Sequence, residues 1–150
     1  MAAERPDQIL HAGDIGDLGV LDQLGTIAPV LAVRGNIDAV SRTIPDAVVL
    51  DVLDAGRPRT RVLLVHYGLV GPRLRREVAQ LARGEGASLV ICGHSHVPFI
   101  GTDRGIGVFN PGSVGPRRFH LPIVFGVIDM DRQRLGMHHV DCETGQIWMP

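Results

Sequence analysis

The stretch LVICGHSHVPFI, Leu89 to Ile100, combines a short apolar run with two histidines one residue apart. Four apolar residues followed by glycine are typical of a buried strand that ends in a turn. Histidine is costly to bury without a partner, so a pair at the mouth of a buried strand requires a reason. Metal ligation by His94 and His96 is one candidate.

Upstream of this stretch, other apolar runs also end in polar residues. QILHAGD predicts a short strand followed by Asp14, and PVLAVRGN predicts a second strand followed by Asn36 and then Asp38. AVVLDVLDAGRPRTRVLLVHYG predicts a hairpin whose second strand ends at His66. In open α/β sheets, functional groups gather at the carboxyl ends of the strands, so we expect these side chains to converge.

The remaining segments predict two helices and a β-rich second half. DLGVLDQLGTIA has helical spacing before Pro29, and GPRLRREVAQLARGEG predicts a helix with Leu74, Val78 and Leu81 on one face, stopped by glycine. The segments from Phe99 onward read as short strands joined by Asp, Arg and Gly turns, which is typical of an antiparallel meander. The expected fold class is therefore α/β.

Length and composition bound the function classes. At 150 residues the chain suits a single domain, residues 1–150, with a core that needs no disulfide. A formal net charge of -1 and a pI near 6.6 argue against general nucleic-acid or membrane-surface binding. No apolar stretch reaches 18 residues and the N-terminus has no hydrophobic signal core, so we expect a cytoplasmic protein. Cys92 and Cys142 form no CxxC pair and are expected to be free thiols without a catalytic role.

The residues at the strand ends form a metal-ligand set. Carboxylate, amide and imidazole groups together suit Mn, Fe, Zn, Co or Ni, and the absence of thiolate argues against a structural zinc knot. Taken singly, each residue has an ordinary explanation, because Asp and Asn after glycine are common turn residues and a strand-end histidine usually hydrogen-bonds to backbone. The interpretation as ligands depends on the ordered set: Asp14, Asn36, His66, His94 and His96.

These motifs resemble the calcineurin-like metallophosphoesterases, and within them the small bacterial phosphodiesterases. The family's Gly-Asp, Gly-Asn, lone His and Gly-His-x-His motifs occur here in order, and Asn36, His66 and His94 follow the preceding motif residue after 22, 30 and 28 positions. FNPGSVGPRR also resembles a segment common near the site in the small subfamily. The resemblance covers nearly the whole chain and implies a four-layer α/β/β/α sandwich of two mixed sheets flanked by helices.

The resemblance also implies a two-metal site and a role for each motif residue. Asp14 would bridge both metals, Asn36, His66 and His94 would complete one coordination sphere, and His96 would contribute to the other. Manganese is the first expectation, with Fe, Ni, Co and Zn as alternatives. Two metals can clamp a phosphate, offset its charge and acidify water for attack. The expected catalytic residues are thus Asp14, Asn36, His66 and His94, and the expected substrate contacts are Asn36, Asn110 and Ser113.

The sequence departs from the family pattern at two points. The Asp-x-His motif of the family's first strand is missing, and MAAERPDQ resembles the tail of the helix that follows it, so we expect an N-terminally incomplete domain. The second metal would then keep only Asp14 and His96, and an unpaired strand edge would offer a seam for homo-oligomer formation. Ile37 stands where larger relatives have a histidine that could act as general acid, so good leaving groups should be favoured.

We therefore expect a metal-dependent hydrolase of phosphoesters, most readily phosphodiesters, whose partner is a small phosphoester substrate rather than nucleic acid or membrane. The alternative is a catalytically weak or inactive scaffold of the same fold, as in the eukaryotic retromer subunit that resembles these enzymes. Arg117 and Arg118 follow the Asn-Pro-Gly-Ser turn and could meet a substrate phosphate, although solvent or an interface is the more ordinary role for them.

Overall fold

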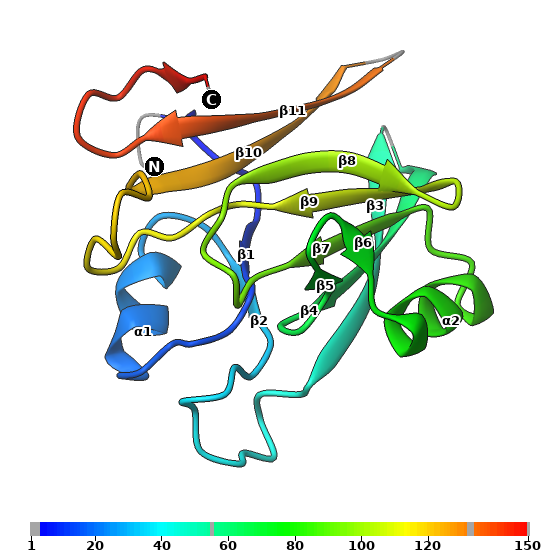
Figure 1. The fold of residues 1–150 in the computed structure, drawn as a ribbon, viewed down its shortest axis with the longest axis horizontal. Helices are drawn as coiled ribbons and strands as arrows, with labels where there is room; N and C mark the ends of the chain where they lie inside the picture. The colour runs from blue at the N-terminus through cyan, green and yellow to red at the C-terminus, as the bar shows by residue number, and fades with distance from the viewer. Residues whose placement is uncertain (1–3, 55, 132–133, 150) are drawn as a thin grey trace.

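The computed structural model describes residues 4–54, 56–131 and 134–149, and Figure 1 shows the arrangement of its elements. In chain order these elements are β1 (Ile9–His11), α1 (Gly19–Gly25), β2 (Val30–Ala32), β3 (Ala47–Asp54), β4 (Arg57–Val65), β5 (Leu69–Val70), β6 (Arg73–Leu74), α2 (Arg76–Gly84), β7 (Leu89–Cys92), β8 (Phe99–Asp103), β9 (Ile106–Asn110), β10 (Val124–Asp131), β11 (Arg134–Asp141) and β12 (Ile147–Trp148).

The largest sheet is five-stranded and mixed, in the order β3-β4-β7-β9-β8. Strands β4, β7 and β9 run parallel, while β3 and β8 pair antiparallel at the two edges. The run Leu89–Cys92 forms the middle strand, and all four of its residues are buried, as the apolar pattern predicts. The predicted hairpin is also present as β3 and β4, with Ala47 opposite Val65.

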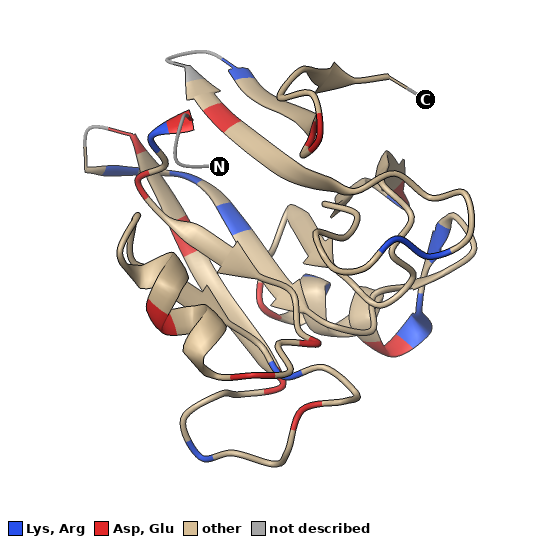
Figure 2. Cartoon of the chain, turned by 90° about the vertical axis from the view of Figure 1, so that its left-hand side faces the viewer, with Lys and Arg blue, Asp and Glu red and all other residues tan. Residues whose placement is uncertain are grey.

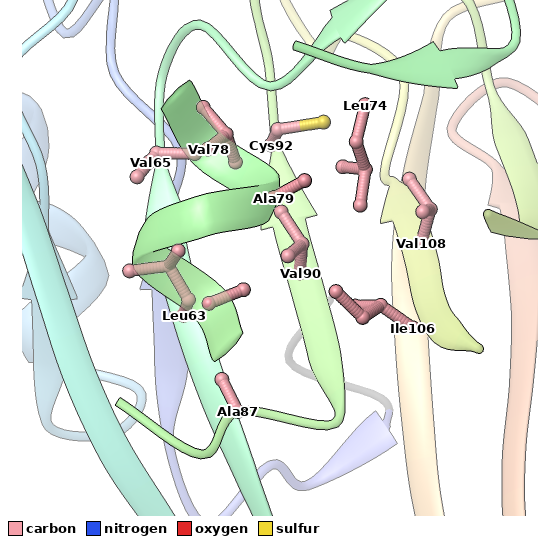
Figure 3. Close-up of a cluster of buried hydrophobic side chains, with 11 residues drawn as sticks. Leu63, Val65, Leu74, Val78, Ala79, Ala87, Val90, Cys92, Ile106 and Val108 are labelled. Atoms are coloured by element: carbon pink, nitrogen blue, oxygen red, sulfur yellow. The ribbon is translucent and has the colours of Figure 1, made fainter. Parts of the chain in front are cut away.

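Alternation along the three parallel strands sends neighbouring side chains into two separate cores. One core lies between this sheet and α2, and Figure 3 shows its side chains; on the sheet it includes Leu63, Val90 and Val108. The other core lies on the opposite face of the sheet and includes Leu64 and Phe109. Burial on both faces explains why these strands read as continuous apolar runs rather than alternating ones.

Helix α2 buries a different face from the predicted one. Val78, Ala79 and Ala82 are buried, whereas Leu81 is 41% exposed and Leu74 belongs to β6. The helix begins only at Arg76, so Leu74 reaches the core from the strand before it. The small side chains of the two alanines allow the helix to pack closely against the sheet. The large apolar side chain of Leu81 therefore does not indicate which face of the helix is buried.

The second β layer covers the other face of the large sheet. It contains the parallel pair β1-β2 and the antiparallel sheet β10-β11-β12, which are separate hydrogen-bonded units among the described residues. Leu10 from β1, Ile128 from β10 and Met137 from β11 pack on the core containing Leu64 and Phe109. Helix α1 contacts β2 and lies on the side away from the large sheet (Figure 1). The predicted four-layer order of helix, sheet, sheet and helix is confirmed.

The predicted meander is correct only for the last three strands. β10, β11 and β12 pair antiparallel in sequence order, but β8 and β9 join the five-stranded sheet, where β9 is parallel to β7. Ile106, Val108 and Phe109 of β9 are buried, which suits a central position rather than an exposed hairpin.

The described surface carries no broad field of one charge. Basic and acidic residues are interspersed over several elements (Figure 2). Both cysteines are free, Cys92 in the core and Cys142 exposed. Burial raises the pKa of the Cys92 thiol to about 12. At seven and nine residues, neither helix of the described chain approaches the length and hydrophobicity of a membrane-spanning helix.

Candidate functional site

The structure brings the predicted strand-end residues together at one edge of the two β layers. Asp14 follows β1, Asn36 follows β2, His66 follows β4, and the turn carrying His94 follows β7. Within each layer the strands concerned are parallel, so their carboxyl ends point to the same edge. The five-residue set comes from four strands that lie up to 80 positions apart in the chain.

The distances within the set are those of one compact cluster. The Asn36 Oδ1 atom lies 3.0 Å from His66 Nε2 and 3.1 Å from His94 Nδ1. The Asp14 Oδ1 atom lies 3.3 Å from His66 Nε2, and Asp14 Oδ2 lies 4.0 Å from His96 Nε2. Asn36 is therefore central, and His96 stands at the margin nearest the second carboxylate oxygen.

The tautomer of His66 shows what the cluster can hold. His66 is 3% exposed, and its Nδ1 lies 2.7 Å from the carbonyl oxygen of Ala12, which can only accept, so Nδ1 carries the proton. The lone pair of Nε2 then faces the carboxylate of Asp14 and the amide oxygen of Asn36. Several acceptors converging without a donor are stabilised by a cation, and a backbone carbonyl on the other ring nitrogen is the usual support of a metal-bound imidazole. The donor set thus fits a divalent metal.

The surroundings of His94 and His96, in the turn after β7, favour the neutral imidazole that binds metal. Burial is the main cause that lowers the pKa of His94, and the electrostatic influence of the neighbouring His66 side chain acts in the same direction. Burial, followed by the charge of Arg118, lowers the pKa of His96, although Asp14 opposes the shift in both. Since a metal ligand must be deprotonated, these shifts favour metal binding near neutral pH.

The amide of Asn36 is necessary to complete the cluster. Within residues 4–54, 56–131 and 134–149, no three His, Cys, Asp or Glu side chains form a metal cage by themselves. The Asn36 amide oxygen contacts both His66 Nε2 and His94 Nδ1, while the Asp14 carboxylate reaches His66 Nε2 directly at 3.3 Å. An amide ligand is easily overlooked in a sequence, because asparagine is common in turns.

Backbone strain is concentrated at this site. Asp14, His94 and His96 have φ values of 58°, 65° and 59°, which is the left-handed region that costs a non-glycine residue about 1 kcal/mol or more. A conformation of this kind persists where surrounding contacts enforce it, and such residues cluster at functional sites. Three of the five candidate ligands therefore owe their direction to a strained turn.

Two glycines allow the ligand turns to touch. A Cβ on Gly13 would lie 2.6 Å from His66 Nδ1 and 2.8 Å from the backbone nitrogen of Gly35, which is too close for either residue to remain in place. A Cβ on Gly35 would collide with the backbone of Asp14. The Gly-Asp and Gly-Asn motifs thus require glycine because the two turns pack directly against one another.

Asp38 joins the same two turns by hydrogen bonds. Its Oδ2 accepts from the backbone N–H of Gly35 at 2.7 Å and of Ile15 at 3.1 Å, and its Oδ1 accepts from Gly16 at 2.9 Å. Burial alone would raise the pKa of this carboxyl, but the backbone donors outweigh it and lower the pKa. Asp38 therefore holds the turns of Asp14 and Asn36 in register.

The side chain of Asn110 is enclosed in the fold and hydrogen-bonded within it. Its side chain is fully buried, its Nδ2 donates to the Gly93 carbonyl oxygen at 2.9 Å and to Ser95 Oγ at 3.0 Å, and its Oδ1 accepts from Gly112. All polar atoms of this side chain are engaged within the fold, and the expected contact of Asn110 with substrate, through side chain or backbone, stays a prediction. Asn110 supports the turn that carries His94 and His96.

Ser113 and Tyr67 lie where a substrate could meet them. Ser113 and His96 line the same small hollow beside the cluster. The Tyr67 ring is 43% exposed and its centroid lies 4.1 Å from that of His94. Tyr67 was not predicted from the sequence, although its position directly after His66 at a strand end was a usable signal.

Comparisons with known proteins agree on one family. A family model described as a calcineurin-like phosphoesterase superfamily domain matches residues 1–133. A probable metallophosphoesterase of Methanocaldococcus jannaschii is 36% identical over 108 residues, which are 71% of this chain and 53% of that protein. One of Methanothermobacter thermautotrophicus is 35% identical over 129 residues, covering 85% and 71%. The matched segment thus spans about half of the Methanocaldococcus protein.

Solved structures show the same fold at low identity. Zn²⁺-complexed Vps29 from Entamoeba histolytica aligns with a TM-score of 0.75 at 22% identity, covering 98% of this chain and 82% of that one. A structure described as a novel archaeal phosphodiesterase aligns with a TM-score of 0.61 at 19% identity, covering 97% and 83%. At these identities the likeness establishes the fold alone.

Proposed function

Since this chain belongs to the calcineurin-like phosphoesterase superfamily, we propose that it is a metal-dependent hydrolase of phosphoesters, with phosphodiesters as its preferred substrates. The observation that carries the proposal is the convergence of acceptor atoms from Asp14, Asn36 and His66 within 3.0 to 3.3 Å. A cluster of acceptors around one point binds a cation, and family membership makes phosphoester hydrolysis the chemistry to test.

In this proposal Asp14, Asn36, His66 and His94 hold one divalent ion, and Asp14 with His96 holds a second, weaker one. When bound, such ions offset phosphate charge and make a coordinated water acidic enough to attack phosphorus. The donors accept Mn, Fe, Co, Ni and Zn, and manganese is the first ion to test. The carbonyl oxygen of Ala12 keeps His66 in the tautomer that can bind a metal through Nε2. Asp38 maintains the spacing between the turn that carries Asp14 and the turn that carries Asn36.

Substrate preference follows from a missing proton donor. The residue after Asn36 is Ile37, which is 61% exposed and cannot protonate a leaving oxygen. Esters whose leaving group is already a weak base need no such help, so aryl and similarly activated diesters should react fastest. Ser113, beside His96, is a candidate for a direct contact with the phosphate.

The test is hydrolysis of bis(p-nitrophenyl) phosphate by the Mn²⁺-loaded protein, compared with the His94→Ala variant. The matched control is His120→Ala, which removes an exposed histidine outside the cluster. We expect His94→Ala to abolish hydrolysis and to weaken Mn²⁺ binding in a calorimetric titration, whereas His120→Ala should retain both. Activity that survives both chelation and His94→Ala would overturn the proposal.

A scaffold function is the second candidate, supported by the structural likeness to Vps29. The same experiment separates the two functions. A chain that binds Mn²⁺ at this cluster but hydrolyses no phosphoester would favour the scaffold, and binding of a protein partner would then survive His94→Ala.

A further inference from the structure

The loop between β9 and β10 borders the His96 side of the site. It lines a small hollow together with His96, contributing Ser113, Arg117 and Arg118. The loop is anchored where the N–H of Val124 donates to the Ser113 carbonyl oxygen at 3.0 Å. A turn in which Leu121 N–H donates to the Arg118 carbonyl oxygen, also at 3.0 Å, holds its middle. The loop therefore presents Arg118 from a defined backbone position.

The two neighbouring arginines differ in how their charges are balanced. The guanidinium of Arg117 forms an ion pair with the carboxylate of Glu143. In the part of the chain that the structure describes, no carboxylate lies within ion-pair distance of Arg118. Arg118 instead lines the hollow that also contains His96, so its charge lies beside the candidate ligand cluster.

No other arginine occupies a comparable position among the described residues. Arg75, for example, has its Nε 2.6 Å from Glu77 Oε1, so its charge is already balanced. Arg118 thus adds a positive charge without an acidic partner beside a cluster that contains one ligand carboxylate, Asp14. An anionic ligand bound in the hollow would balance this positive charge.

We propose that Arg118 binds a non-bridging oxygen of the substrate phosphate on the His96 side of the site. This inference rests on the proposed function, because it assigns the anion to the phosphoester. The guanidinium is planar and presents paired donors that match two phosphate oxygens. Arg118 would therefore be a substrate-binding residue that sets affinity, while the ligand cluster is responsible for the chemistry.

The experiment compares Arg118→Gln, Arg118→Lys and the matched control Arg117→Gln, each loaded with Mn²⁺. Two quantities are measured: KM and kcat for bis(p-nitrophenyl) phosphate, and the Kd of inorganic phosphate by isothermal titration calorimetry. Because a hydrogen bond to a charged group contributes about 1.5–3 kcal/mol, we expect Arg118→Gln to raise KM and the phosphate Kd about tenfold or more. Arg118→Lys keeps the positive charge but lacks the paired donors of the guanidinium, so its KM and phosphate Kd should lie between those of the parent chain and those of Arg118→Gln.

Three further results complete the expected pattern. Arg117→Gln should leave both constants within about twofold, the Mn²⁺ affinity of Arg118→Gln should equal that of the parent chain, and its KM should depend less on salt concentration. Unchanged KM and phosphate Kd in Arg118→Gln would overturn the inference while hydrolysis by the parent chain upholds the proposed function. Equal losses in Arg117→Gln and Arg118→Gln would also overturn it, because they indicate general charge attraction.

The calorimetric arm keeps the two proposals separable. If the parent chain hydrolyses nothing, the proposed function fails, and phosphate binding still decides the role of Arg118. Selective weakening of that binding in Arg118→Gln supports the inference, and a parent chain that binds no phosphate overturns it.

Discussion

The two ends of the five-stranded sheet handle polar groups in opposite ways. At the end where β4 and β7 begin, Arg61 forms two hydrogen bonds to the Asp51 carboxylate, at 2.8 and 2.9 Å, and Thr60 Oγ1 lies 2.7 Å from Ser88 Oγ. At the carboxyl end, the acceptors of Asp14, Asn36 and His66 face one another. Polar groups at the first end satisfy one another, whereas the second end leaves acceptors facing one another, as the proposed metal site requires.

The volume of the hollows alone would place the functional site at the wrong end of the five-stranded sheet. The hollow around Asp51, Thr60 and Arg61 has an open volume of about 600 Å³, against about 180 Å³ beside His96. The larger one, however, is lined by side chains that already satisfy one another, including ion pairs between β3 and β4. Polar groups without complementary partners mark a binding site better than volume does.

Replacing Gly35 by alanine should damage the carboxyl end most. The added Cβ meets the backbone of Asp14, which cannot move without shifting a ligand, so we expect the free energy of unfolding to fall by about 3 kcal/mol. Urea unfolding measures this loss, and Mn²⁺ affinity should fall with it. The control Gly25→Ala places a methyl group in open space at the end of α1 and should be neutral or stabilising.

Replacing Asp38 by asparagine should separate the two ligand turns more gently. The amide offers one oxygen where the carboxylate accepts from Ile15, Gly16 and Gly35, so we expect a loss of about 2 kcal/mol in urea unfolding. Mn²⁺ affinity, measured by calorimetry, should fall because the turns lose register. The control Asp46→Asn changes an exposed carboxylate that pairs with Arg34 and should not affect metal affinity. Unaltered Mn²⁺ binding in Asp38→Asn would contradict this role.

Acid should weaken the protein through its buried histidines. Burial is the main cause of a lowered pKa at His11, His94, His96 and His139. A histidine with a lowered pKa binds fewer protons when folded, so stability is constant above the unfolded value of about 6.5 and falls as the pH drops toward the folded value. Thermal unfolding of the metal-free chain between pH 7.5 and pH 5 should therefore show a falling Tm.

His139 offers a specific check of that pH dependence. It is buried, and its Nε2 lies 2.7 Å from the carbonyl oxygen of Asn110, so the neutral ring donates there. His139→Gln keeps a donor that does not titrate, and we expect a shallower fall of Tm with pH. A slope equal to that of the parent chain would show that His139 titrates alike in the folded and unfolded chain.

Breaking the opposite end of the sheet should have the smallest effect. The Arg61–Asp51 pair is exposed, so Arg61→Ala should lower Tm only slightly, and less at high salt. Hydrolysis and Mn²⁺ binding should remain at the level of the parent chain. A loss of metal binding in Arg61→Ala would show that the two ends of the sheet are coupled, and would contradict the view that they are independent.

Most strand ends were predictable because they depend on local patterns. Apolar runs that end in a polar residue predicted the positions of Asp14, Asn36, His66 and His94, and the structure gathers all four. The same reasoning was wrong for Leu81 and for β9, since burial depends on which neighbour an element meets. The enclosure of the Asn110 side chain was not predictable for a similar reason, because no local pattern shows which groups surround it.

The sequence by itself determined the element types, the family resemblance and the chemical nature of the ligand set, because periodicity, turn residues and motif order are local properties. The tertiary structure alone decided the tautomer of His66, the contact that excludes a side chain from Gly35, and the balanced charge of Arg117 beside the unbalanced one of Arg118. These features depend on distances between residues remote in the chain, and such distances exist only once the two β layers have packed.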